Sequence, residues 1–115
     1  AFARVRGRAA VIAILEEENL VEGAREKGDH LAGELRALVA ELPNVCELER
    51  GQGLIRGLML RPGYVARDVV AKAALSGLLL TGAGERVLRF VPPLVVTKSE
   101  LSEAVKMLRG VLTSL

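Results

Sequence analysis

VCELERGQGLIRGLML, residues 45–60, is the stretch that decides the fold. Its first part, VCELER, alternates between apolar and charged residues, which is typical of a strand with one buried face. We therefore expect Cys46 and Leu48 on one face and Glu47 and Glu49 on the other. The glycines of GQG then predict a turn. LIRGLML follows as the returning strand, so the stretch predicts a β-hairpin.

Helical patterns precede the hairpin. Residues 9–18, AAVIAILEEE, are expected to form a helix, which Asn19 either interrupts or merely turns. A second helix then runs to about Leu42, with apolar residues spaced by three and four positions. Gly28 lies on that apolar stripe, which indicates a close approach by another backbone. Pro43 ends the helix.

Four further segments complete the expected fold. Residues 65–76 predict a short amphipathic helix, residues 78–80 a short buried strand and residues 86–91 another strand, with TGAGE as the turn between the two strands. Thr97 and Glu100 stand at capping-box spacing and open a last helix. The order of elements predicts an α+β domain, in which a mostly antiparallel sheet of about four strands carries helices on one face.

The composition is that of one globular domain. Half of the 115 residues are hydrophobic and only 3% are aromatic, so the core must be built from Leu, Val and Ala. No apolar run approaches membrane-spanning length, no signal peptide opens the chain and Cys46 is the single cysteine, so we expect a cytoplasmic location. Without Arg4, Arg6 and Arg8 the net charge of +2 becomes −1. Neither nucleic acid nor a membrane is therefore expected as a partner.

No complete set of catalytic, cofactor-binding or metal-binding residues is recognisable. His30 is the only histidine, and no cysteine or second histidine stands at ligand spacing. A Ser-His-Asp arrangement stays open on spacing alone, although no nucleophile elbow is present. GQG lacks the third glycine of a dinucleotide site, and TGAGE lacks the lysine of a P-loop. Cys46 is expected to be a buried, inert thiol.

Arg89 is a charge in the middle of an apolar strand. Leu88 and Phe90 face one side of that strand, and Arg89 shares the other side with Val87 and Val91. If Leu88 and Phe90 meet the helices, the apolar neighbours of Arg89 imply that its own face is covered as well. A charge in such a place normally has a partner, and the planar guanidinium suits a carboxylate. The alternative, an arginine at a sheet edge that reaches water, stays open.

Three stretches carry a resemblance to a known family: ILEEENLVEGAREKGDHLAGELRAL, RGQGLIRGLML and VLRFVPPLVVTKSELSEAVKMLRGVL. In this order they resemble the C-terminal small domain of the class III pyridoxal-phosphate-dependent aminotransferases, with the acetylornithine and ornithine types nearest. The resemblance covers nearly the whole chain but not its opening. We therefore expect residues 1–8 to be a divergent basic segment and residues 9–115 to be the small domain.

The resemblance implies a role for Arg89. In this family the arginine before PPL binds the α-carboxylate of the amino-acid or 2-oxo-acid substrate, and Arg89 stands at that position. The implied parent enzyme is a homo-oligomer that uses pyridoxal 5'-phosphate to transfer an amino group from an amino acid to 2-oxoglutarate in arginine metabolism.

The family's cofactor-binding residues lie in a large domain that would cover the face of Arg89. The 115-residue chain alone is therefore expected to be inactive and to bind no cofactor. An alternative from another class is a non-catalytic α+β module that binds a small carboxylate or a protein partner.

Overall fold

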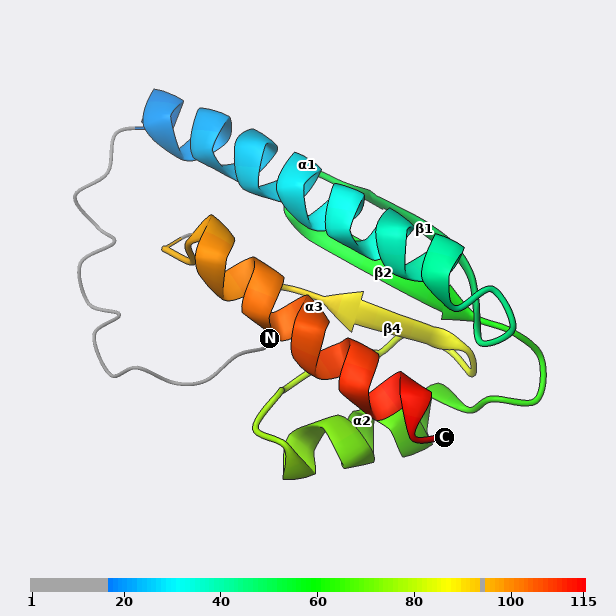
Figure 1. The fold of residues 1–115 in the computed structure, drawn as a ribbon. Helices are drawn as coiled ribbons and strands as arrows, with labels where there is room; N and C mark the ends of the chain where they lie inside the picture. The colour runs from blue at the N-terminus through cyan, green and yellow to red at the C-terminus, as the bar shows by residue number, and fades with distance from the viewer. Residues whose placement is uncertain (1–16, 94) are drawn as a thin grey trace.

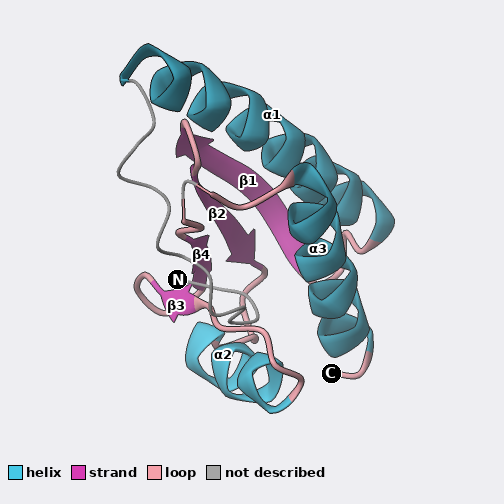
Figure 2. Ribbon diagram, turned by 90° about the vertical axis from the view of Figure 1, so that its left-hand side faces the viewer, coloured by secondary structure: helices cyan, strands magenta, loops and turns pink. Residues whose placement is uncertain are grey.

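The computed structural model describes residues 17–93 and 95–115. Its elements, in chain order, are α1 (Glu17–Glu41), β1 (Cys46–Gln52), β2 (Ile55–Leu60), α2 (Ala66–Leu75), β3 (Thr81–Gly82), β4 (Val87–Phe90) and α3 (Lys98–Thr113). The strands form one sheet in the order β1-β2-β4-β3, and each neighbouring pair is antiparallel. The α1 and α3 helices lie side by side over this sheet, and α2 lies at its β3 end (Figures 1 and 2). The predicted α+β class is confirmed.

The core lies between the sheet and the three helices that the structure describes. Leu58, Leu88 and Phe90 of the sheet are fully buried there, as are Leu35 of α1 and Leu108 of α3. Removing one such side chain from water contributes about 1.5–3 kcal/mol. Leucines therefore supply most of the burial, as the scarcity of aromatic residues requires.

The long helix follows the prediction at one end and departs from it at the other. Helix α1 ends at Glu41, just before Pro43, as expected. Asn19, however, lies within α1 and does not interrupt it. Asparagine costs less than about 1 kcal/mol in a helix interior, so it does not by itself end a helix. Most of the helix predicted over residues 9–18 lies outside the described residues.

The third strand is displaced from its predicted place. Leu78 and Leu80 are buried in the core, but residues 78–80 form no strand. Pairing with β4 begins only at Thr81, which lies opposite Arg89. The apolar run at residues 78–80 was therefore a signal of burial and not of strand pairing, a distinction that periodicity alone does not make for short runs.

The hairpin contains an irregularity that the alternation did not predict. Its register shifts between Cys46 and Leu48, so that Cys46 lies opposite Leu60 but Glu49 lies opposite Leu58. Because an extra residue in a strand reverses the alternation beyond it, Glu49 shares the helix-covered face with Cys46. The predicted placement of Glu49 on the opposite face from Cys46 was wrong.

The turn of the hairpin is also later than predicted. Gly51 and Gln52 belong to β1, and the turn itself is Gly53-Leu54. Gly53 has a φ of 54°, in the left-handed region that favours glycine. Helix α1 passes so close to this turn that a Cβ added at Gly28 would overlap the carbonyl of Gly53. The close backbone approach predicted at Gly28 is confirmed.

The last helix opens with the predicted capping box. The hydroxyl of Thr97 accepts a hydrogen bond from the backbone N–H of Glu100 at 3.1 Å, and the Glu100 carboxylate accepts one from the N–H of Thr97 at 2.9 Å. These bonds satisfy two donors that a helix start otherwise leaves open. No helix within the described residues is long and apolar enough to span a membrane.

Candidate functional site

Arg89 lies on the sheet face that points away from the helices. Its neighbours Leu88 and Phe90 are fully buried against the helices, as predicted, whereas Arg89 itself is exposed. Strand β4 lies between β2 and β3, so Arg89 is in the interior of the sheet and not at its edge. Its cross-strand partners are Gly57 of β2 and Thr81 of β3. Within the described part of the chain, no carboxylate pairs with the Arg89 guanidinium.

A groove of about 570 Å³ opens beside Arg89. Its lining comes from the hairpin and from β4 with the residues before it: Arg50, Gly51, Gln52, Ile55, Arg56, Gly57, Ala83, Val87 and Arg89. Gly57 keeps part of this space free, because a Cβ there would lie 3.3 Å from Cγ1 of Val87. A glycine at this position therefore leaves room next to the Arg89 side chain.

A second exposed arginine lines the same groove. Arg50 of β1 and Arg89 of β4 are both paired with Gly57, from opposite sides. Two strand spacings place their Cα atoms about 10 Å apart. Neither arginine has an ion-pair partner among the described side chains, so the groove is positively charged and suits an anion. Arg50 was not among the residues predicted from the sequence, although it directly precedes the glycines of the hairpin.

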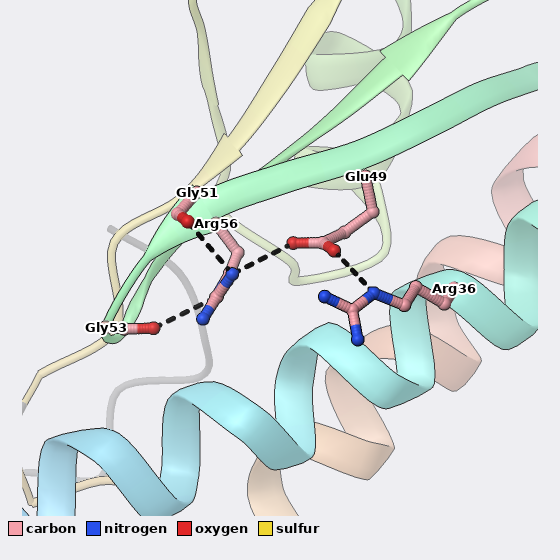
Figure 3. Close-up of polar contacts among 5 residues, drawn as sticks. All are labelled: Arg36, Glu49, Gly51, Gly53 and Arg56. Carbon is pink, nitrogen blue, oxygen red and sulfur yellow. Dashed lines mark hydrogen bonds and ion pairs between the residues drawn. The ribbon is translucent and has the colours of Figure 1, made fainter.

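The third arginine of the groove, Arg56, is neutralised by a buried carboxylate (Figure 3). Its Nη1 lies 3.3 Å from Oε2 of Glu49, and Nε of Arg36 lies 3.0 Å from the other oxygen. Sequence reasoning missed this cluster because it expected Glu49 on the other face. The available signal was an arginine inside the apolar run LIRGLML, the same signal that drew attention to Arg89.

Apolar side chains surround the groove on the open face. Ile55 is 53% exposed and Val91 is 36% exposed, although both lie in or beside strands. Val87 and Met59 are half-buried on the same face. Large apolar side chains that are exposed next to one another are typical of a contact surface. This arrangement agrees with the expectation that the face of Arg89 is covered by something outside the described residues.

His30, another candidate residue, lies outside the groove and contacts a second helix. His30 Nε2 lies 2.7 Å from the hydroxyl oxygen of Ser102, which joins α1 to α3. Asp29 is exposed and adjacent to His30 on the helix, where neighbouring side chains diverge, so the described residues form a pair and not a Ser-His-Asp triad. Nowhere in residues 17–93 and 95–115 do three potential metal ligands of the His, Cys, Asp or Glu type come together.

Cys46 is the buried thiol that the sequence predicted. Its side chain lies in the core under α1, and burial raises the pKa of the thiol from 9.0 to about 11. A thiol is nucleophilic only as the thiolate, so Cys46 is inert at neutral pH.

Comparison with known proteins identifies the family. Residues 6–112 match the family model described as aminotransferase class-III, and the chain belongs to this family. Curated relatives include the acetylornithine aminotransferase of Nostoc sp., 43% identical over 107 residues that cover 91% of this chain and 25% of the relative. The acetylornithine aminotransferase of Thermosynechococcus vestitus is 47% identical over 92 residues, which cover 78% of this chain and 22% of that protein. The family resemblance seen in the sequence is confirmed.

Solved structures agree at the level of the fold. The acetylornithine aminotransferase of Elizabethkingia anophelis superimposes with a TM-score of 0.76 at 23% identity, covering 86% of this chain and 25% of that one. The chain therefore spans about a quarter of the length of the relatives that it matches.

Proposed function

We propose that this chain is the C-terminal small domain of a pyridoxal-phosphate-dependent aminotransferase and that Arg89 binds the α-carboxylate of the substrate. The observation that carries this proposal is the position of Arg89. It is an exposed arginine in the interior of a sheet, beside a groove, and no described carboxylate pairs with it. Membership of the class III family supports the reaction type.

The fold gives Arg89 the rigidity that orientation of a substrate requires. Strand β4 is hydrogen-bonded on both sides, and the fully buried Leu88 and Phe90 anchor it on the helix face. A guanidinium on such a strand can hold a carboxylate through two parallel, charge-assisted hydrogen bonds. Holding the substrate in one orientation lowers the entropic part of the reaction barrier.

We infer that pyridoxal phosphate is held outside the described residues. This cofactor is bound as a Schiff base to a lysine, and the four lysines of the chain lie on helices, away from the groove: Lys27, Lys72, Lys98 and Lys106. The cofactor would therefore be held by a larger domain that the 115-residue chain does not contain. That domain would cover the open sheet face around Arg89, including Ile55 and Val91.

The names of the relatives support a more specific proposal for the whole protein. The relatives from Nostoc sp. and Thermosynechococcus vestitus are both acetylornithine aminotransferases. The parent protein would accordingly take an amino group from an acetylornithine- or ornithine-type donor and pass it to 2-oxoglutarate in arginine metabolism. It would act as a homo-oligomer in the cytoplasm, with residues 9–115 as the small domain and residues 1–8 as a divergent segment.

A non-catalytic carboxylate-binding module is the second candidate. The observation that favours it is the pair Arg50 and Arg89 beside an open groove, because this pair can attract a carboxylate without any cofactor. The two candidates differ in what the full-length protein does to a bound acid, since only an aminotransferase changes it.

The test is a half-reaction of the purified full-length protein that contains this chain. With N-acetylornithine alone, the cofactor absorbance is expected to convert to that of the pyridoxamine form, and 2-oxoglutarate is expected to restore it. Binding of either acid without any spectral conversion would overturn the aminotransferase proposal and favour the non-catalytic module.

A further inference from the structure

Glu49 is a carboxylate whose side chain is completely enclosed. It has 0% side-chain exposure, on the face of β1 that helix α1 covers. Arg36 donates a hydrogen bond to one carboxylate oxygen at 3.0 Å, and Arg56 donates one to the other at 3.3 Å (Figure 3). A buried ion pair stabilises a fold no more than apolar side chains of similar size would. The main effect of Glu49 is therefore to hold its partners in one position, and not to add stability.

Arg56 connects Glu49 to the turn of the hairpin. Its Nε donates a hydrogen bond to the carbonyl of Gly53 at 2.9 Å, and its Nη1 donates one to the carbonyl of Gly51 at 3.1 Å. Only 11% of the Arg56 side chain is exposed. Two glycines give this turn much conformational freedom. A guanidinium that is fixed by a buried carboxylate and hydrogen-bonded to one carbonyl in the turn and one just before it restricts that freedom.

The strand ends next to this turn form a wall of the groove at Arg89. Gly51, Gln52 and Ile55 line this groove together with Arg89. Arg56 is also paired with Phe90, the residue that follows Arg89 on β4. The position of the wall relative to the Arg89 guanidinium thus depends on the contacts of Arg56.

We propose that Glu49 is a positioning residue for carboxylate binding. Through Arg56, which binds the carbonyls of Gly51 and Gly53, it holds Gly51 and Gln52 in place as the wall of the groove that Arg89 lines. This inference rests on the proposed role of Arg89. Arg36 of α1, whose side chain is 69% exposed, forms an ion pair with the other oxygen of the Glu49 carboxylate.

The test uses the full-length, cofactor-loaded protein with Glu49→Gln, which keeps the size of the side chain and removes its charge. Misplacement of a binding group by about 1 Å can cost up to about a hundredfold in rate. We therefore expect KM for the carboxylate substrates to rise about tenfold or more, with a much smaller change in kcat. Glu49→Asp retains the charge and is expected to give an intermediate KM.

A double variant separates positioning from general stability. If Glu49 acts through the Arg89 groove, Glu49→Gln should add little to the KM of an Arg89→Gln protein, because the groove has already lost its carboxylate-binding group. Val111→Ala, in the core of α3 and outside the groove, serves as a control that lowers Tm without raising KM. Glu49→Gln overturns the inference if it behaves like this control, or if its effect on KM is unchanged in the Arg89→Gln protein.

A second single variant covers the case in which Glu49→Gln does not fold. In Arg56→Met, Arg36 still neutralises Glu49, but the carbonyls of Gly51 and Gly53 lose their donor. The same rise in KM is expected, and an unchanged KM would overturn the inference. If Arg89→Gln itself leaves KM unchanged, the proposed function of Arg89 fails. If Arg89→Gln raises KM but Glu49→Gln and Arg56→Met leave KM unchanged, only the positioning role of Glu49 fails.

Discussion

Replacing Gly28 with alanine should destabilise the protein through one contact. The added methyl group would overlap the carbonyl of Gly53, and the next backbone atom, the Leu54 nitrogen, would lie 3.1 Å away. Because both neighbours are backbone atoms, no side chain can rotate aside, and either α1 or the hairpin must move. Overpacking of this kind costs about 1–3 kcal/mol, and the gain in helix propensity offsets about 1 kcal/mol. Since the overlap is severe, we expect a net loss of about 2 kcal/mol.

Gly33→Ala is the matched control on the same helix. Gly33 is exposed, and a Cβ there meets nothing within 4 Å, so only the propensity gain applies. It should raise the free energy of unfolding by about 0.5–1 kcal/mol. Urea unfolding of both variants, followed by circular dichroism, gives the two changes directly. If Gly28→Ala stabilises the protein as Gly33→Ala does, the close packing of α1 on the turn is refuted.

Three further outcomes are expected. The Cys46 thiol should resist iodoacetamide at pH 8 in the folded protein and react in urea. Because burial raises the pKa of this thiol to about 11, the thiol of the unfolded chain ionises at a lower pH than that of the folded chain. The free energy of unfolding should therefore fall as the pH rises above about 9. Constant stability between pH 8 and 11 would contradict this. Thr97→Ala should lose about 1 kcal/mol of stability with the capping box, whereas Thr113→Ala, exposed in the last turn of α3, should lose less than about 0.5 kcal/mol; equal losses would contradict the cap. The 115-residue chain alone should form no stoichiometric lysine adduct with pyridoxal phosphate, and borohydride trapping with peptide mapping would reveal one.

The sequence predicted those parts of the fold in which local pattern and tertiary packing agree. The hairpin, the final capped helix and the burial of Leu88 and Phe90 opposite Arg89 all follow from periodicity and turn residues. Gly28 was also interpretable, because a glycine on an apolar helical stripe has few explanations other than close backbone contact. These elements were sufficient for the fold class and for the face on which Arg89 lies.

The buried cluster around Glu49 could not be predicted in the same way. A single irregularity between Cys46 and Leu48 reverses the alternation of β1, and nothing in VCELER marks its position. With Glu49 assigned to the wrong face, its contacts with Arg36 and Arg56 were not foreseen. Long-range pairing of this kind depends on strand register, which a one-residue shift changes completely.

An arginine inside an apolar strand indicates a paired charge, but the sequence does not show which group pairs with it. Arg56 and Arg89 both interrupt apolar runs, yet Arg56 is paired within the chain and Arg89 is not paired with any described carboxylate. The difference arises from the face that each side chain takes, because Arg56 points toward α1 and Arg89 points away from the helices. The structure therefore keeps Arg89 as the candidate binding residue and assigns Arg56 a partner within the chain.

The binding of a substrate carboxylate by Arg89 is tested most directly by the half-reaction kinetics of Arg89→Lys and Arg89→Ala in the full-length, cofactor-loaded protein. Loss of a desolvated arginine–carboxylate pair typically costs about 2–5 kcal/mol. This corresponds to a loss in kcat/KM of roughly 30- to 5000-fold for each half-reaction, because both the amino acid and the 2-oxo acid carry an α-carboxylate. Lysine should restore activity only in part, since it lacks the planar fork.

Arg67→Ala, which removes an exposed arginine of α2, is the control and should leave both half-reactions unchanged. The decisive measurement is kcat/KM for the two half-reactions of Arg89→Ala, taken with Tm on the same sample. We predict a large loss in both half-reactions with Tm nearly unchanged, because no described carboxylate depends on Arg89 as an ion-pair partner. Normal kinetics in the folded variant, with or without a lower Tm, would contradict the role of Arg89 in substrate binding.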